Sequence, residues 1–324
     1  MASDVIYTDS FGREVGYLPW ATGDFIEGDR NTLSLKVPVM DALAQDCYLM
    51  IDGTEYGGVI DGLRIDTSKS YMEVTGRTWT GILESSVIVP PSGQSHYVVS
   101  GDANAVIKAV IERQGLGFCM CAEGEPSGFA LSSYQFDRYC TAYEGLRKAL
   151  ASVGAQLSIA YDGAARKAKL SAVKREDLRG NPIDGDRAKF TLTQTRPVNH
   201  IVALGSGEGT ARLVLHAWAD ADGNVVPSQA LFGIEEKTEV YDNTNADDAA
   251  RLREDAEKRL ADYQENIRSF QMSEDQDGAY GVGALIAAVY APRNTVVEAV
   301  IVRKTASVSK RGITYKTVCK TLGA

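Results

Sequence analysis

Alternating apolar and polar residues mark the first ninety positions of the chain. The alternation has a period of two over Thr32–Val37, Tyr56–Ile65 and Tyr71–Gly76, and Gly- and Asp-containing turns separate these runs. Because a β-strand directs successive side chains to opposite faces, this pattern predicts half-buried strands. We therefore expect residues 1–92 to be β structure throughout, forming a small barrel or sandwich that ends at the linker Pro90–Gly93.

The pattern changes to a helical period in residues 93–185. Asp102 is suited to cap a helix that runs to Gln114. A second helix is predicted to begin at Thr141, where Glu144 completes a capping box. A hairpin around Asp162-Gly163 follows, so this part of the chain predicts a small α+β domain.

Strand-like runs return in residues 186–324, with one long helix between them. The helix is expected over residues 245–267, with Asn245 as its cap and an apolar stripe along one face. Within it, Glu254–Lys258 and Asp255–Arg259 have the spacing of weak ion pairs. The stripe is Leu252, Ala256, Leu260, Tyr263 and Ile267, and the strands are expected at 200–204, 212–218, 297–302 and 313–320.

Two glycine-rich segments of this last part resemble ligand loops but are better explained as turns. Gly205–Gly209 lacks the following helix that a dinucleotide-binding loop needs, since an extended run comes next. Asp220–Asn224 begins like a calcium loop, but Leu231 occupies the position of the essential Glu. We expect a strand connection and a hairpin turn, respectively.

Composition narrows the classes of function. The 324 residues include 34 Lys and Arg against 43 Asp and Glu, a net charge of −9, which disfavours nucleic-acid binding as the main activity. The longest apolar stretch, Gly281–Ala291, is far shorter than the ~20 residues of a membrane-spanning helix, so we expect no membrane insertion. No signal peptide is expected at the N-terminus.

No constellation of residues points to catalysis. Cys119 and Cys121 lack a second pair for structural zinc, so the five cysteines are interpreted as free thiols. The three histidines, His96, His200 and His216, form no metal-binding spacing. We therefore predict no catalytic residues, no metal site and no cofactor, and the chain is not expected to be an enzyme.

The order of three segments resembles the tail-hub (baseplate hub) proteins of bacteriophages, especially the siphophage tail-protein group. The first segment runs from Gly57 through Val74–Leu83 to the Pro90-Pro91 ending. The second is Asn199–Gly209 with Arg212, and the third begins at Tyr280–Gly283 and ends in the final two strands.

This resemblance implies an α+β, mostly β fold with two tube-lining β-barrel domains, a peripheral α/β insert and one long inserted helix. The domains would be 1–92, 93–185 and 186–324. It implies a homotrimer whose two barrels per chain imitate six-fold symmetry. Such a trimer would join a hexameric tail tube or distal tail protein to a trimeric tip, fibre or receptor-binding protein, with DNA passing through unbound. The expected location is the virion, after assembly in the host cytoplasm.

Rival readings remain open at this stage. One is the hub of a prophage-derived bacteriocin or another contractile injection device. Others are a tail-tip cell-wall hydrolase and a stand-alone carbohydrate-binding module. In the tail-hub reading the candidate site residues are architectural or lie at interfaces: Gly76, Arg77, Trp79, Asn199, Gly205, Gly207, Glu208 and Arg212.

Overall fold

The computed structural model describes residues 5–18, 20–51, 53–183, 189–264, 268–273, 280–290 and 295–322. The chain divides into two compact units. The first comprises Met1–Lys189, Met272–Val296 and Val300–Val318, and the second comprises Phe190–Gln271, Val297–Ala299 and Cys319–Ala324.

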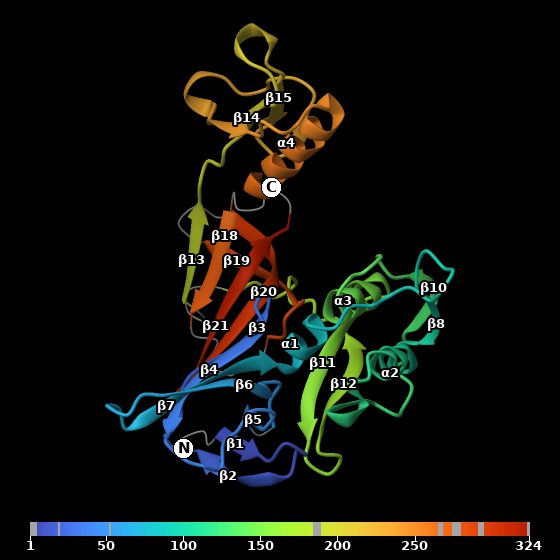
Figure 1. Cartoon of the computed structure of the whole chain (residues 1–324), viewed down its shortest axis with the longest axis vertical. Coiled ribbons are helices and arrows are strands. Elements are labelled where there is room, and N and C mark those ends of the chain that lie inside the picture. The colour runs from blue at the N-terminus through green and yellow to red at the C-terminus, as the bar shows by residue number, and fades with distance from the viewer. Residues whose placement is uncertain are drawn as a thin grey trace. The chain divides into compact units, whose positions relative to one another are not determined.

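An open sheet forms much of the first unit (Figure 1). Its strands follow the order β21-β20-β3-β4-β7-β6-β5-β1-β2, with β19 also paired to β20, so that β2 is an edge strand. All neighbouring pairs from β20 to β2 are antiparallel. The strands are β1 (Val5–Thr8), β2 (Glu14–Leu18), β3 (Thr22–Gly28), β4 (Thr32–Pro38), β5 (Tyr48–Ile51), β6 (Gly57–Ile65), β7 (Tyr71–Thr78), β19 (Leu285–Tyr290), β20 (Thr295–Ser309) and β21 (Gly312–Thr321).

The three strands predicted from alternation are confirmed as β4, β6 and β7. In β4, Leu33, Leu35 and Val37 are buried while the residues between them face outward. Leu35 lies opposite Val74 of β7, and both belong to the core cluster on this side of the sheet. The alternation therefore predicted correctly which side chains of these strands face the core. A register shift of one residue would have turned every buried side chain to the other face of the sheet.

The prediction of β structure throughout residues 1–92 is wrong at one place. Helix α1 (Trp79–Glu84) directly follows β7, and the Thr78 side chain accepts a hydrogen bond from the Gly81 N–H at 3.3 Å. Residues Trp79–Leu83 are all buried, so this run carries no helical polar face that the sequence pattern could reveal.

The α+β part of the first unit follows the predicted plan. Asp102 and Thr141 cap their helices as expected, and Gly115 adopts the left-handed conformation (φ 68°) after the first of them. The predicted hairpin is formed by β11 and β12, and β9 adds a parallel third strand. The elements are β8 (Val98–Asp102), α2 (Ala103–Arg113), the 3-10 helix η1 (Leu116–Phe118), β9 (Met120–Ala122), β10 (Ala130–Gln135), α3 (Ala142–Ser152), β11 (Ala155–Asp162) and β12 (Lys167–Lys174).

A four-stranded sheet and one helix make up most of the second unit. The strand order is β16-β15-β14-β17, in which β14 and β17 are parallel. One face of β14 packs on the helix, and Ile201 and Ala203 are fully buried there. The elements are β13 (Lys189–Gln194), β14 (His200–Leu204), η2 (Gly209–Ala211), β15 (Val214–Ala219), β16 (Val225–Val226), η3 (Gly233–Glu235), β17 (Thr238–Asp242), α4 (Ala249–Gln264) and β18 (Arg268–Ser273).

The predicted hairpin turn at Asp220–Asn224 is confirmed. It joins the antiparallel strands β15 and β16. One carboxylate oxygen of Asp220 accepts hydrogen bonds from the backbone N–H groups of Asp222 and Asn224 at 3.0 and 2.9 Å. The side chain that resembled a calcium ligand therefore serves as a local turn acceptor.

Helix α4 begins later than predicted, and Asn245 does not cap it. Asp248 takes that role, since its side chain accepts from the Ala250 N–H at 2.9 Å and its carbonyl accepts from Leu252. The buried stripe Leu252, Ala256 and Leu260 is as predicted, whereas Ile267 lies outside the described residues. The predicted ion pair between Asp255 and Arg259 is also wrong, because Arg259 pairs instead with Glu239 of β17, at 2.8 Å.

Candidate functional site

Gly76 and Arg77 lie where β7 crosses an irregularity in β6. The register of β6 shifts between Ile60 and Gly62, and the Arg77 guanidinium donates to both oxygens of the intervening Asp61 at 2.9 and 2.8 Å. A side chain at Gly76 would bring its Cβ within 1.9 Å of the Val59 carbonyl oxygen. Glycine is therefore required for the close approach of the two strands, and the ion pair fixes the bulge residue.

Trp79 is the largest fully buried side chain of the chain's described part and joins two elements distant in sequence. Its ring meets Tyr48 of β5 edge-on, with centroids 5.3 Å apart. It also stacks on Tyr161 of β11 at 5.9 Å. Trp79 thus links the large sheet to the α+β part through one shared hydrophobic core.

Asn199 organises the segment that precedes β17 in the second unit. Its amide nitrogen donates to the Glu235 carbonyl at 2.7 Å, and its side-chain oxygen accepts from the Lys237 N–H at 2.9 Å. Only 4% of the residue is exposed. This asparagine acts as a buried connector between β14 and the loop that contains η3.

The glycine-rich corner after β14 is a strand connection, as predicted. Gly207 has φ 99°, and a Cβ there would lie 2.7 Å from the Ala211 carbonyl oxygen. Arg212 donates to the Gly205 carbonyl at 3.0 Å and pairs with Asp242 of β17. Glu208 is exposed beside this corner and makes no capping bond to η2.

The structure therefore sorts the candidate residues into two groups, one in each unit. Gly76, Arg77 and Trp79 follow one another at the end of β7, and the remaining five surround the start and end of β14. Their contacts explain local architecture. Their proposed presence at interfaces between subunits stays a prediction.

Sequence reasoning missed a set of buried charges in the first unit. Lys304 of β20, only 1% exposed, lies opposite Glu27 of β3, which is 5% exposed. The Lys304 ammonium is 3.4 Å from a carboxylate oxygen of Glu55. The sequence did contain a sign of this pair. Phe25 and Ala306 are buried on the same face of the sheet, two residues from Glu27 and Lys304, so both charged residues stand at inward positions of their strands.

Glu27 is held by a hydrogen-bond network that leads to α1. The Thr80 hydroxyl donates to one Glu27 carboxyl oxygen and is 2.7 Å from the side-chain oxygen of Asn31. The Asn31 amide donates in turn to Glu84 at 2.9 Å. Burial raises the pKa of Glu27 well above its usual value, and the nearby Glu55 and Glu84 charges add to this effect.

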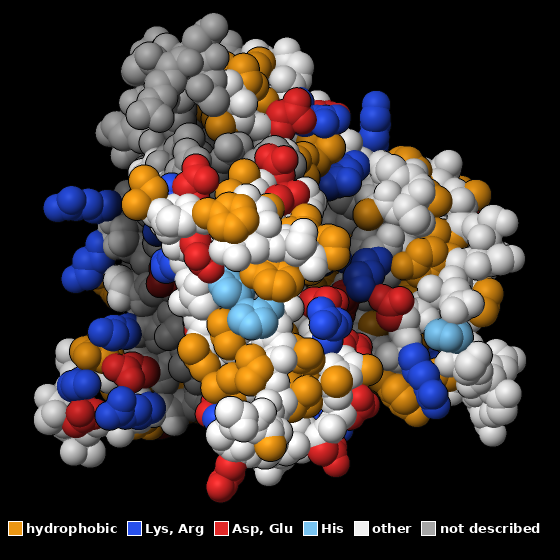
Figure 2. Space-filling model, turned by 90° about the horizontal axis from the view of Figure 1, so that it is seen from above, with side chains coloured by type: hydrophobic (Ala, Val, Ile, Leu, Met, Phe, Trp, Pro, Cys, Tyr) orange, Lys and Arg blue, Asp and Glu red, His pale blue; other side chains and the backbone are white. Residues whose placement is uncertain are grey.

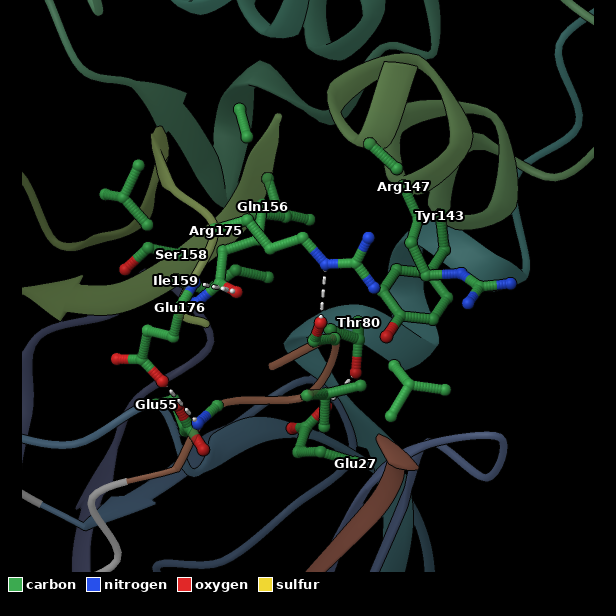
Figure 3. Close-up of a pocket in the computed structure, with 18 residues that line it drawn as sticks. Glu27, Glu55, Thr80, Tyr143, Arg147, Gln156, Ser158, Ile159, Arg175 and Glu176 are labelled. Atoms are coloured by element: carbon green, nitrogen blue, oxygen red, sulfur yellow. Dashed lines mark hydrogen bonds between the residues drawn. The ribbon is translucent and has the colours of Figure 1, made fainter. Parts of the chain in front are cut away.

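A cavity of about 250 Å³ lies beside this network (Figure 3). It is lined from one side by Glu27, Glu55 and Thr80, and from the other by residues of α3, β11 and the segment after β12. Arg147, Arg175 and Glu176 supply further charges to its wall. Charged side chains of both signs thus line one small cavity within a single unit.

Two histidines form a hydrogen-bonded stack on the second unit, on the face of its sheet opposite α4. In Figure 2 they lie together, bordered by hydrophobic side chains. Glu236 is 2.6 Å from Nδ1 of His200, whose Nε2 is 2.8 Å from His216, and Trp218 stacks on both rings. Because His216 occupies the position that a catalytic triad gives to its nucleophile, this arrangement is not a triad.

The cysteine pair singled out from the sequence has no nucleophilic character. Burial raises the pKa of the Cys119 thiol to about 11 and also raises the pKa of Cys121. Both thiols are free and remain protonated at neutral pH. Among the described residues, no group of His, Cys, Asp and Glu has the arrangement of a metal site.

Large apolar side chains are exposed on both units. In the second unit Ile234 is 90% exposed, Phe232 is 62% exposed and Val240 is 59% exposed. Phe118 is similarly exposed at 71% on the α+β part. No described helix is both long and apolar enough to cross a bilayer.

Comparison with solved structures shows which known fold this is. A tail protein from Neisseria meningitidis MC58 matches 99% of this chain and 97% of its own length, with a TM-score of 0.51 at 15% identity. The chain has the fold of that tail protein. The tail-protein resemblance predicted from the sequence is thus confirmed at the level of the fold, and so is an α+β, mostly β architecture.

Two further solved tail proteins align with nearly the whole chain at lower TM-scores. A 43 kDa tail protein of prophage MuSo2 from Shewanella oneidensis has a TM-score of 0.49 at 13% identity and covers 98% of both chains. The prophage tail protein gp18 from Listeria monocytogenes has 0.47 at 12%, covering 98% of this chain and 94% of its own. No protein-family model matches the sequence, and neither does any curated protein.

Proposed function

We propose that this chain is a structural tail-hub protein at the distal end of a phage tail, not an enzyme. The observation that carries the proposal is the tail-protein fold, which extends over 99% of the chain and includes both units. In this role the hub joins a hexameric tail tube or distal tail protein to a trimeric tip, fibre or receptor-binding protein. The mature location is the virion, and assembly takes place in the host cytoplasm.

The proposed assembly is a homotrimer in which two β domains of each chain line a tube. The division into 1–92, 93–185 and 186–324 assigns the β domains to the two ends of the chain and the α+β part to the periphery. The edge strand β2 has backbone N–H and C=O groups on its outer side that no strand pairs with in the described sheet. Closure of the open sheet into a barrel, or the addition of a strand from a neighbouring subunit, would give these groups hydrogen-bond partners. Ring closure needs heterologous contacts, which the exposed Ile234 and Phe232 can supply.

Imaging of tails that contain this chain tests the proposal. We expect a ring of three copies by cryo-electron microscopy, and mass photometry of tail-tip subassemblies should give a three-copy mass. A six-fold or single-copy hub would contradict the proposal. The tail itself is the decisive sample, because ring contacts can require the tube.

The same images separate the rival functions. A contractile particle around the ring identifies the hub of a bacteriocin or another injection device. A stand-alone carbohydrate-binding module requires a monomer with an aromatic groove, and a cell-wall hydrolase requires turnover of peptidoglycan by the purified protein.

A further inference from the structure

The cavity in the first unit has two poles of opposite charge (Figure 3). Its acidic pole consists of Glu27 and Glu55, its basic pole consists of Arg147 and Arg175, and Glu176 adds a third acidic side chain to the lining. At about 250 Å³ it is smaller than the ~300–1,000 Å³ typical of sites for drug-sized ligands. The volume therefore suits a compact molecule.

The acidic pole has hydrogen-bonding capacity that the protein leaves unused. One carboxyl oxygen of Glu27 accepts from Thr80, while the other is buried and has no hydrogen-bond partner among the described residues. A buried oxygen of Glu55 likewise lacks a hydrogen bond, although it is 3.4 Å from the Lys304 ammonium. Leaving such an atom unsatisfied costs free energy, so a ligand that donates a hydrogen bond here is favoured.

The basic pole is equally incomplete. Nε of Arg175 donates to the Gly283 carbonyl at 2.9 Å, which fixes the side chain across the cavity and directs it toward Tyr143 (Figure 3). The structure gives no partner, within the described part of the chain, to the terminal nitrogens of Arg175 or to the guanidinium of Arg147. Two guanidinium groups with free donors are the usual recognition elements for a carboxylate.

We propose that this cavity binds a small zwitterion of the amino-acid or dipeptide class, with its amino group at Glu27 and Glu55 and its carboxylate at Arg147 and Arg175. A simple anion would satisfy only the basic pole and would face the charges of Glu55 and Glu176. A neutral sugar would leave both guanidinium charges without a counter-charge. The inference is independent of the tail-hub role.

Proton release provides a second signature of this binding mode. Burial raises the pKa of Glu27 and so favours the protonated form of its carboxyl group in the empty site, whereas an arriving ammonium favours the ionised form. Binding of an already charged amino group should therefore release a proton to the buffer. Titration calorimetry in two buffers of different ionisation enthalpy measures that release directly.

The test uses the full chain with glycylglycine as the probe. We expect saturable binding by calorimetry or by NMR chemical-shift changes at about 10 mM ligand or below. N-acetylglycylglycine and glycylglycinamide, each lacking one charge, should bind about tenfold or more weakly. These two singly blocked compounds also represent the ends of a protein chain, so equal binding of either one would replace the small-molecule proposal with chain-end recognition.

Variants assign the two poles. Glu27→Gln should weaken glycylglycine about tenfold and abolish the proton release, and Arg147→Ala should weaken it about tenfold without affecting the release. Arg64→Ala, on the exposed end of β6, is the matched control and should bind like wild type. No binding of glycylglycine by the wild-type protein, or equal binding of inorganic phosphate, overturns the proposal without reliance on any variant.

Discussion

Lys304 and Glu55 form an ion pair in which the ammonium is enclosed and the carboxylate side chain is partly exposed. The Lys304 side chain is 1% exposed and that of Glu55 is 36% exposed, with 3.4 Å between nitrogen and oxygen. The ammonium also lies 5.7 and 5.5 Å from the ring centroids of Tyr56 and Tyr315. The Lys304 charge therefore relies on Glu55 for compensation, whereas the Glu55 charge is also partly compensated by solvent.

This asymmetry predicts unequal costs of substitution. Glu55→Gln weakens the compensation of a buried charge and should lower the free energy of unfolding by about 3 kcal/mol. Lys304→Met keeps the apolar stem and leaves a carboxylate that is partly exposed, so it should cost less, about 1 kcal/mol. Urea denaturation measures both variants, and a larger loss for Lys304→Met would refute the argument.

The buried Glu27 predicts that stability falls as the pH rises. Its pKa is raised in the folded state, so between its ordinary value and the raised one the folded chain binds more protons than the unfolded chain. The Glu27 contribution is then fully present below about pH 4 and is lost as the pH rises, by at most about 1.4 kcal/mol per pH unit.

Glu27→Gln should remove this component, so that the variant equals or exceeds the stability of the wild type near neutral pH. Denaturant midpoints measured at several pH values test it. Glu112→Gln, at an exposed position of α2, is the control and should keep the wild-type slope. An unchanged slope in Glu27→Gln would show that the carboxyl group is ionised in the folded protein.

The corner after β14 predicts a sharp difference between two nearby glycines. Gly207→Val combines a positive φ of 99° with a Cβ only 2.7 Å from the Ala211 carbonyl, so it should block folding of the second unit or its assembly. Gly209 also has a positive φ of 56°, but its Cβ would meet nothing within 4 Å.

Gly209→Asn is thus the matched control, because asparagine tolerates this conformation, and it should cost at most about 1 kcal/mol. Circular dichroism and tail assembly give the two readouts. Normal assembly of Gly207→Val together with the loss of an enzymatic activity would replace the architectural interpretation with a catalytic one.

The exposed apolar side chains predict where assembly is most sensitive. Ile234→Asp, at a position 90% exposed, should leave the folded monomer intact and weaken ring formation tenfold or more, as for interface hot spots of ~2 kcal/mol. Phe118→Asp lies on the proposed peripheral part and should assemble normally. Equal effects of the two substitutions, by mass photometry, would mean that Ile234 has no specific role.

The net charge of −9 predicts the character of the proposed channel. Lys and Arg along the inner wall would hold phosphates in a salt-dependent manner, whereas an acidic or neutral wall lets the duplex slide. We expect more Asp and Glu than Lys and Arg to face the three-fold axis. A basic inner wall, or tight binding of duplex DNA by the isolated protein at physiological salt, contradicts this expectation.

Local signals in the sequence were sufficient where the structure depends on near neighbours. The caps at Asp102 and Thr141 and the turn at Asp220 are formed by residues within four positions of their partners, and all three were predicted. The cap of α4 was misplaced because Asn245, Asp247 and Asp248 all suit the role, and the sequence pattern does not distinguish Asp248, which accepts from the Ala250 N–H in the structure.

Long-range pairing could not be deduced in the same way. Lys304 meets Glu27 only because β20 pairs with β3 across more than 270 residues of chain. The cavity likewise depends on segments around Glu27, Arg147 and Gly283 that the fold alone brings together. A charged residue at an inward position indicates that it has a partner in the fold, but the sequence does not identify that partner.

The position of Trp79 allows its fluorescence to report on the contact between the large sheet and the α+β part. The chain has three tryptophans, and Trp79 is 1% exposed while Trp20 is 61% exposed. Trp218, stacked on two imidazoles, senses the second unit instead. In a Trp20→Phe, Trp218→Phe background, the emission of Trp79 should be blue-shifted and inaccessible to iodide, and should redden when the α+β part separates from the large sheet. Loosening between Tyr48 and Tyr161 can then be followed in real time without an attached dye.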